Sequence, residues 1–248
     1  MTPEIDDAFD RIRDVYGAGS LDRIEEMLHA NKKSCHPLQS GARWLLPGIT
    51  QKPWHDPYKH SEIAPLVHAF QANHAVIKNE VGQVWQRRRE KFADYEHYLT
   101  RQENWQALYL YRDRGLAADA RAVIPTAVRV LDDRAVATDL VCPLLESHLS
   151  TLLPGAEIKP HCDLWNFSIN LHFAIDIPPN CGIRVAGETR QWDEGQCLLF
   201  DYSFEHEAWN HGTRPRTCLL VDLWHPETTL AEREALDTLI TEIRSTMA

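Results

Sequence analysis

The spacing of apolar side chains changes near residue 105. Up to about residue 100 they recur every three or four positions, as in Ile5–Val15 and Ile63–Phe70, which predicts amphipathic helices. From Trp105 onward, apolar and polar residues alternate, most clearly over Ser168–Ile177, which predicts strands with one apolar and one mostly polar face. The pattern therefore indicates a helical N-terminal part, about residues 1–100, followed by a strand-rich part.

The strand-rich part consists of short apolar runs separated by Gly, Pro, Asn and Asp. Further runs are Ile183–Val185, Cys197–Phe200 and Thr217–Leu223. Many short strands with turn residues between them are typical of a β-sandwich or barrel. Thr229–Glu232 has the sequence of a capping box and predicts a C-terminal helix over about residues 229–247. We expect a single domain over residues 1–248, with its β core at about 105–228 and helices before and after it.

Charge and composition exclude several classes of protein. Asp plus Glu outnumber Lys plus Arg by 36 to 26, a formal charge of −10, so a nucleic-acid partner or an anionic membrane surface is disfavoured. No apolar run is long enough to cross a bilayer, and the acidic start MTPEIDD does not resemble a secretory signal. The six cysteines contain no C-x-x-C pair, which favours reduced thiols. We expect a cytoplasmic protein with no membrane partner.

Three residues have the types and spacing of a metal site. His161 and Asp163 are two apart, so their side chains point to the same face if Lys159–Asp163 is extended. A third ligand must come from a distant segment, and the candidate is His206, on or just after the short strand Leu198–Asp201. Two imidazoles and a carboxylate on one side of a metal leave the other positions open, as Fe(II) oxygenases need for a cosubstrate and then O2. We predict that these three residues form a catalytic metal site.

Arg216 follows His206 by ten residues and begins the predicted strand Thr217–Leu223. A guanidinium group pairs bidentately with a carboxylate, so Arg216 is suited to hold the far end of a dicarboxylate such as 2-oxoglutarate, whose keto acid end chelates iron. The combination of His-x-Asp, a remote histidine and this arginine is more specific than any of its parts. The plainer interpretations are that Arg216 forms a surface ion pair and that Asp163 shapes a turn or accepts a hydrogen bond from a ligand imidazole.

Five stretches between about Ser150 and Glu227 carry a family resemblance. They are LPGAEIKPH, NLHF, GETRQWDEG, FDYSFEHEAWN and VDLWHPE, with KPWHD and WQALYLY as weaker upstream counterparts. Together they resemble the aspartyl/asparaginyl β-hydroxylase family of Fe(II)/2-oxoglutarate oxygenases. The resemblance implies a double-stranded β-helix, a jelly-roll of the cupin type, flanked here by the predicted α-helices. It also implies Fe(II) as cofactor, with 2-oxoglutarate and O2 as cosubstrates.

The resemblance assigns roles residue by residue. His161 and His206 match the two iron-binding histidines of the family. Arg216 matches the arginine that holds the distal carboxylate of the cosubstrate. Ser150 and His172 match positions that help to bind the cosubstrate, and the alternation places His172 on the polar face of its strand.

Three positions separate this chain from animal members of the family. Asp163 stands where they have glycine and bind iron through two histidines, so this chain resembles the ordinary triad more closely. Ser168 and Asn170 stand where they have two arginines that help to recognise an acidic side chain of a protein substrate. These two residues, with Trp165, are the candidates for the substrate pocket. The expected substrate is an amino acid, a peptide or another small molecule.

Two other functions are compatible with the same residues. A site made by His161, Asp163 and His206 also suits Zn(II), which would activate water for hydrolysis, although a hydrolase has no need for Arg216. The third hypothesis is a non-catalytic jelly-roll that binds a small molecule or a protein. The leading prediction is an Fe(II)/2-oxoglutarate-dependent dioxygenase that hydroxylates an unactivated C–H bond with release of succinate and CO2.

Overall fold

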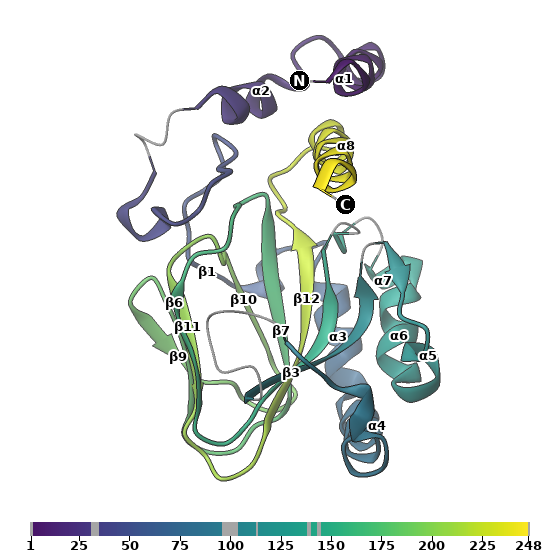
Figure 1. Ribbon diagram of the computed structural model, residues 1–248, viewed down its shortest axis with the longest axis vertical. Coiled ribbons are helices and arrows are strands. Elements are labelled where there is room, and N and C mark those ends of the chain that lie inside the picture. Colours follow the sequence, from purple (N-terminus) through teal and green to yellow (C-terminus); the bar gives the residue numbers. More distant parts are fainter. Residues whose placement is uncertain are drawn as a thin grey trace.

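Two antiparallel sheets face each other at the centre of the molecule, and helices cover the outside of the larger sheet (Figure 1). The computed structural model describes residues 2–30, 35–95, 104–112, 114–137, 140–142 and 145–247. Apolar residues of both sheets meet between them, such as Ile158 and Ile183 of the smaller sheet and Phe200 and Cys218 of the larger. This arrangement is the jelly-roll that the resemblance implied, so the predicted fold class is confirmed.

Hydrogen bonds join the strands into a larger and a smaller sheet. The larger sheet has the order β1 (Trp54–His55), β10 (Cys197–Phe200), β7 (Ser168–Asp176), β12 (Arg216–Trp224), β5 (Ser147–Leu152), β3 (Trp105–Arg112) and β2 (Ala93–Asp94), and β4 (Gly115–Leu116) pairs with β3. The smaller sheet has the order β6 (Ala156–His161), β11 (His206–Asn210), β8 (Cys181–Val185) and β9 (Glu188–Arg190).

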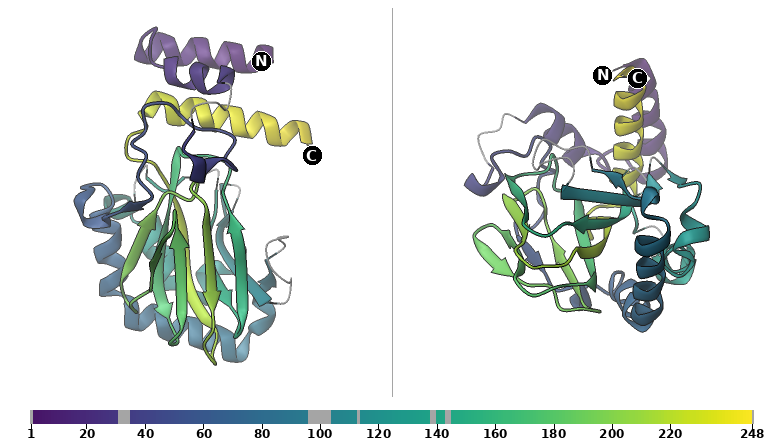
Figure 2. Two further views of the ribbon diagram at one scale, coloured as in Figure 1. Left: turned by 90° about the vertical axis from the view of Figure 1, so that its left-hand side faces the viewer. Right: turned by 60° about the horizontal axis from the view of Figure 1, so that its bottom comes forward.

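Helices cover the outer face of the larger sheet and one end of the barrel (Figures 1 and 2). Those on the outer face are α3 (Ala64–Ala72), α4 (His74–Arg87), α5 (Ala120–Val123), α6 (Pro125–Asp132) and α7 (Arg134–Ala137). Those at the end of the barrel are α1 (Pro3–Tyr16), α2 (Asp22–His29) and α8 (Leu230–Met247). Short 3-10 helices cover Pro37–Gln39, Pro57–Lys59 and Arg89–Lys91.

Strand β7 has an apolar outer face and a polar inner face, as the alternation predicts. Leu171 and Phe173 belong to a core shared with the helices, where Phe173 stacks on Phe70 of α3 with ring centres 5.2 Å apart. Asn170 and His172 alternate with these two residues along the strand and line a cavity between the sheets. Nearly all of β7 is buried, so its polar face is desolvated as well as its apolar one.

The sequence pattern does not predict α5, α6 and α7, which fall inside the range assigned to the β core. Helix α6 begins at Pro125, whose fixed φ suits the first turn of a helix. Its residues Ala127, Val128 and Val130 are buried in the same core as α3. Short, valine-rich helices lack a periodicity that distinguishes them from strands, which explains why they were missed.

The C-terminal helix begins with the predicted capping box. Thr229 N donates to Glu232 Oε2 at 2.8 Å, and Glu232 N donates to Thr229 Oγ1 at 3.2 Å. Arg23 of α2 donates two hydrogen bonds to the Glu232 carboxylate, each 2.7 Å long. The cap therefore also connects α2 to α8. Helix α1 lies beside α8 (Figure 2).

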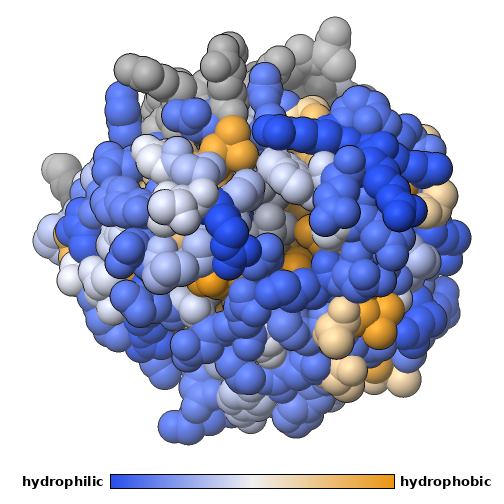
Figure 3. Space-filling model, turned by 90° about the horizontal axis from the view of Figure 1, so that it is seen from below, coloured by the Kyte–Doolittle hydropathy of each residue, from blue (hydrophilic) through white to orange (hydrophobic). Residues whose placement is uncertain are grey.

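The surface agrees with the charged composition. Seen from below, it is mostly hydrophilic, with hydrophobic residues near the centre of this face and in a small group at the lower right (Figure 3). Within the described ranges, no helix combines the length and the apolar character needed to span a membrane. The six cysteines, all within the described ranges, are thiols that form no disulfide bond.

We expect Phe173→Ala to lower the free energy of unfolding by about 3–5 kcal/mol, because it replaces a fully buried ring with a cavity between sheet and helix. Urea denaturation followed by circular dichroism measures the change. Val76→Ala is the control, because Val76 lies on α4 and is 50% exposed, and its effect should stay within about 0.5 kcal/mol. Equal effects of the two substitutions would contradict the assignment of this interface as the main core.

Candidate metal centre

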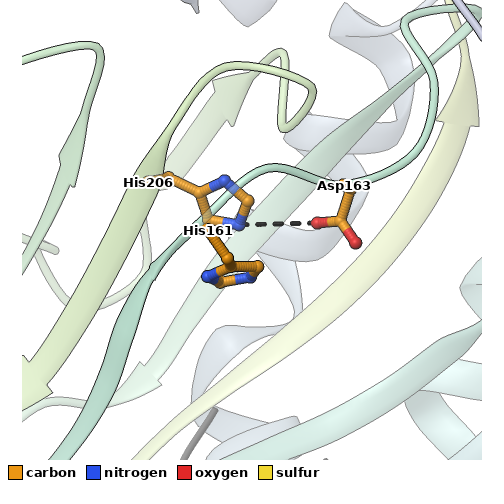
Figure 4. A group of neighbouring side chains, drawn as sticks. All are labelled: His161, Asp163 and His206. Atoms are coloured by element: carbon orange, nitrogen blue, oxygen red, sulfur yellow. Dashed lines mark ion pairs between the residues drawn. The ribbon is translucent and has the colours of Figure 1, made fainter. Parts of the chain in front are cut away.

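Three potential metal ligands converge where β6 meets β11 (Figure 4). His161 is the last residue of β6, His206 is the first residue of β11, and the two are paired in the sheet register. Together with Asp163 they offer ligand atoms that all lie within 4.8 Å of one another. The sequence placed His206 on or just after the strand ending near Asp201. It lies instead on a separate strand of the opposite sheet.

Both imidazoles are oriented by the same backbone contact. His161 Nδ1 lies 2.8 Å from Lys159 O, and His206 Nδ1 lies 2.9 Å from Phe204 O. A carbonyl oxygen can only accept, so each Nδ1 carries the proton and each Nε2 presents a lone pair. Burial, followed by the effect of His161, lowers the pKa of His206 to about 3. His206 is therefore neutral, as a metal ligand must be.

Asp163 lies beyond the end of β6, not on one extended strand with His161 as the sequence analysis assumed. Its N–H donates to Tyr202 O at 2.9 Å, and in this loop its carboxylate faces His206 (Figure 4). Asp163 Oδ2 is 3.5 Å from His206 Nε2. Desolvation in the cavity, and next the Asp222 carboxylate, raises the pKa of Asp163 to about 7. A cation at this point would favour the ionised carboxylate.

The donor set fits a divalent transition metal. Two imidazole nitrogens and a carboxylate oxygen converge, with their ligand atoms within 4.8 Å of one another. Two nitrogen ligands and one carboxylate suit Fe(II), and also Zn(II). His161, Asp163 and His206 would hold such an ion from one side and leave its other positions open.

A buried polar network shapes the loop before His206. Asp201 accepts hydrogen bonds from Ser203 N at 2.9 Å and from Ser203 Oγ at 2.6 Å. Gln39 Nε2 donates to Ser203 Oγ at 2.8 Å. These hydrogen bonds of Asp201 thus fix the conformation of the loop that leads to His206. No sequence pattern indicates Gln39, because it lies 164 residues away from its partner.

Arg216 begins β12 and lines the same cavity as the three ligands. It is 1% exposed, and its guanidinium carbon lies 4.5 Å from the centre of a ring of Trp192. Its Nε and Nη1 have no hydrogen-bond partner among the described residues. The surface ion-pair interpretation is therefore wrong. An unpaired buried charge costs several kcal/mol, so this position calls for an anionic ligand.

Ser150 and His172 line the cavity together with Arg216. Ser150 Oγ accepts a hydrogen bond from Trp105 Nε1 at 2.9 Å and can donate its own proton into the cavity. His172 lies parallel to Trp192 with ring centres 6.0 Å apart, and burial, then Arg216, lowers its pKa well below the usual value. Trp192 thus contacts two site residues, and no local sequence pattern indicates this role.

The three candidate substrate residues take different positions. Asn170 lines the cavity, whereas Ser168 and Trp165 are not among its lining residues and lie behind Tyr202. Trp165 Nε1 donates to the Tyr202 hydroxyl at 2.9 Å, and Ser168 Oγ donates to Leu223 O at 2.8 Å. Tyr202, which the sequence analysis did not select, forms the wall in their place.

Comparison with known protein families agrees with this geometry. Residues 71–226 match the family described as aspartyl/asparaginyl beta-hydroxylase. The chain belongs to this family. The matched range includes all of the predicted site residues, from Ser150 to Arg216.

Several animal members of the aspartyl/asparaginyl β-hydroxylase family are similar to this chain. Aspartyl/asparaginyl beta-hydroxylase of Mus musculus is 30% identical over 190 residues, which are 76% of this chain and 25% of the mouse protein. Aspartate beta-hydroxylase domain-containing protein 2 of Xenopus tropicalis is 46% identical over 94 residues, which are 37% of this chain and 25% of that protein. This chain thus matches about a quarter of the length of each relative.

Solved structures with a similar arrangement are more distant. A prolyl-4-hydroxylase of Pseudomonas putida has a TM-score of 0.40 at 13% identity, over 64% of this chain and 98% of that one. A predicted oxalate decarboxylase of Thermotoga maritima has a TM-score of 0.32 at 12% identity, over 49% of this chain and 81% of that one.

We expect Asp163→Ala to weaken the binding of a divalent metal by at least about tenfold, because it removes one of three donors and the only negative charge among them. Anaerobic titration of the metal-free protein with Co(II), followed by visible absorption, measures the affinity. Glu157→Ala is the control, because Glu157 also lies on the β6 segment but pairs with His211 at the surface. Unchanged affinity in Asp163→Ala would indicate a two-histidine site.

Proposed function

We propose that this protein is an Fe(II)- and 2-oxoglutarate-dependent oxygenase that hydroxylates an unactivated C–H bond of an amino acid, a peptide or another small molecule. The observation that carries the proposal is the buried, unpaired Arg216 in the same cavity as the His161, Asp163 and His206 cluster. A fixed cation and an open metal site in one desolvated cavity match a dicarboxylate that also chelates the metal.

The residues between Arg216 and the cluster would complete the cosubstrate site. In the sheet register, Ser150 pairs with Cys218 and His172 pairs with Leu220, so both follow Arg216 along β12. Arg216 and Ser150 would bind the distal carboxylate of 2-oxoglutarate, and neutral His172 would offer a hydrogen bond further along. Bound iron, 2-oxoglutarate and O2 supply the oxidising power, and the other products are succinate and CO2.

The protein contributes fixed geometry and exclusion of water. Lys159 O and Phe204 O hold the two imidazoles with Nε2 toward the metal position. The apolar side chains of Ile158 and Phe200 line the cavity, which strengthens every charge interaction inside it.

The alternatives are less well supported. A Zn(II) hydrolase would use the same three ligands but leave the cost of burying Arg216 unexplained. A non-catalytic jelly-roll would have no reason to keep two histidines turned by matched backbone contacts toward a carboxylate. Membership of a hydroxylase family also favours the oxygenase.

Arg216→Met should separate cosubstrate binding from folding. We expect it to weaken 2-oxoglutarate binding by at least about 30-fold, since one partner of a buried charge pair is worth roughly 2–5 kcal/mol. We expect the ligand-free protein to be as stable as the wild type or more stable, because an uncompensated buried charge is removed. The visible band of the anaerobic Fe(II)–2-oxoglutarate complex measures binding, and urea denaturation measures stability.

Arg214→Met is the matched control, because Arg214 is exposed and pairs with Asp176. It should leave the visible band unchanged. A large loss of stability in Arg216→Met with normal cosubstrate binding would mean that Arg216 is structural.

Turnover distinguishes the oxygenase from the hydrolase. We expect succinate to form from 2-oxoglutarate in the presence of Fe(II) and air, at a low rate without substrate and faster with it. His206→Ala should abolish this reaction, because it removes a metal ligand. Succinate formation that survives this substitution, or product formation without O2, would contradict the proposal.

A further inference from the structure

Beyond His172, three side chains with hydrogen-bond acceptors line the cavity wall. Asp222 of β12 pairs in register with Asn170 of β7, and Asp222 N donates to Glu146 O beside it. All three side chains line the cavity. Asp222 lies six residues along β12 from Arg216, roughly 20 Å for an extended strand. This end of the cavity is therefore distinct from the proposed distal-carboxylate site.

The orientation of Asn170 leaves an acceptor unmet. Its Nδ2 donates to Asp222 Oδ1 at 2.6 Å. Because a carboxylate oxygen accepts a hydrogen bond, this contact fixes the orientation of the Asn170 amide. Oδ1 is then the amide atom that is left to accept a hydrogen bond from another group. Asn170 is 8% exposed, and its Oδ1 has no partner among the described residues. A donor from a ligand would satisfy it.

His148 adds a second unmet group to the same wall. It is 5% exposed, and neither ring nitrogen has a hydrogen-bond partner within the part of the chain that the structure describes. Its Nδ1 is 3.7 Å from Glu146 Oε2, and burial lowers its pKa to about 3, so the ring is neutral. Tyr95 stacks on it with ring centres 5.4 Å apart.

Negative charge at this end is not balanced by the protein. Glu146 pairs with Arg112 at 3.0 Å, but no cation among the described residues forms an ion pair with Asp222. Desolvation raises the pKa of Asp222 to about 7. A bound cation would favour its ionised form.

We infer that the substrate presents an ammonium or guanidinium group to Asp222, Glu146 and Asn170 Oδ1. The inference rests on the proposed function, since it takes the metal cluster as the place of reaction. A substrate with a carboxylate here would meet two carboxylates and an amide oxygen. The substrate class is therefore a basic amino acid, an amine or a peptide with a basic group.

Probe pairs that differ in one charge test this inference. One pair is Nα-acetyl-lysine amide with Nα-acetyl-norleucine amide. The other is leucine amide with Nα-acetyl-leucine amide. Nα-acetyl-glutamate amide serves as the anionic probe. Calorimetry without air measures their dissociation constants, both for the metal-free protein and for protein given Fe(II) and 2-oxoglutarate. We expect the cationic member of at least one pair to bind at least about tenfold more tightly than its neutral partner.

Two substitutions locate the preference. Asp222→Asn and Glu146→Gln should each reduce this ratio to within about threefold, with the Fe(II)–2-oxoglutarate visible band retained. Asp176→Asn is the control, since Asp176 lies at the end of β7 and pairs with Lys78 and Arg214. It should leave the ratio of the neutral and cationic dissociation constants unchanged. Glu146→Gln keeps the test decisive if Asp222→Asn does not fold.

Three results would overturn the inference. The first is that neutral or anionic probes bind as tightly as the cations. The second is that no cationic probe binds. The third is that the preference for cations survives both substitutions. Failure of the proposed function would show itself differently, as absence of the visible band and of succinate, because the probe affinities do not depend on turnover.

Discussion

Burial of both faces of the larger sheet is the constraint on which the site depends. The outer face is apolar and packs on helices, while the inner face carries Arg216, His172 and Asn170 beneath the smaller sheet. Polar atoms of all three lack partners among the described residues. An unmet buried polar group costs about 1–3 kcal/mol, and a charge costs more. The inner face is thus a surface that ligands complete.

The metal cluster depends on strand ends and register. His161 ends β6 and His206 begins β11, and their pairing brings the two rings to 4.0 Å between centres. Each ring is turned by the carbonyl two residues before it, so the backbone sets the direction of Nε2. A one-residue slip of β11 would move His206 to the other face of the sheet. The loop held by Asp201 and Ser203 prevents such a slip.

Local patterns in the sequence sufficed for some features of the fold and the site. The alternation in β7 and the capping box at Thr229 were predictable because each lies within a few residues of the chain. The ligand types were predictable from His-x-Asp and a remote histidine. The strand that carries His206, the loop that turns Asp163 and the support from Trp192 were not, because each depends on contacts between segments distant in sequence. The unmet atoms of His148 are likewise visible only in three dimensions.

Charge balance links the two ends of the cavity. In the proposed complex, the positive charges of the iron and Arg216 are balanced by the negative charges of Asp163 and of the two carboxylates of 2-oxoglutarate. Glu146 is offset by Arg112. Asp222 alone is then left without a counter-charge, in a cavity where desolvation already raises its pKa. Beside a neutral substrate, desolvation would favour the protonated form of Asp222, whereas a cationic substrate would pair with its ionised form as it closes the cavity. An anion at Arg216 and a cation at Asp222 would therefore each favour the charged form of the buried group that they meet.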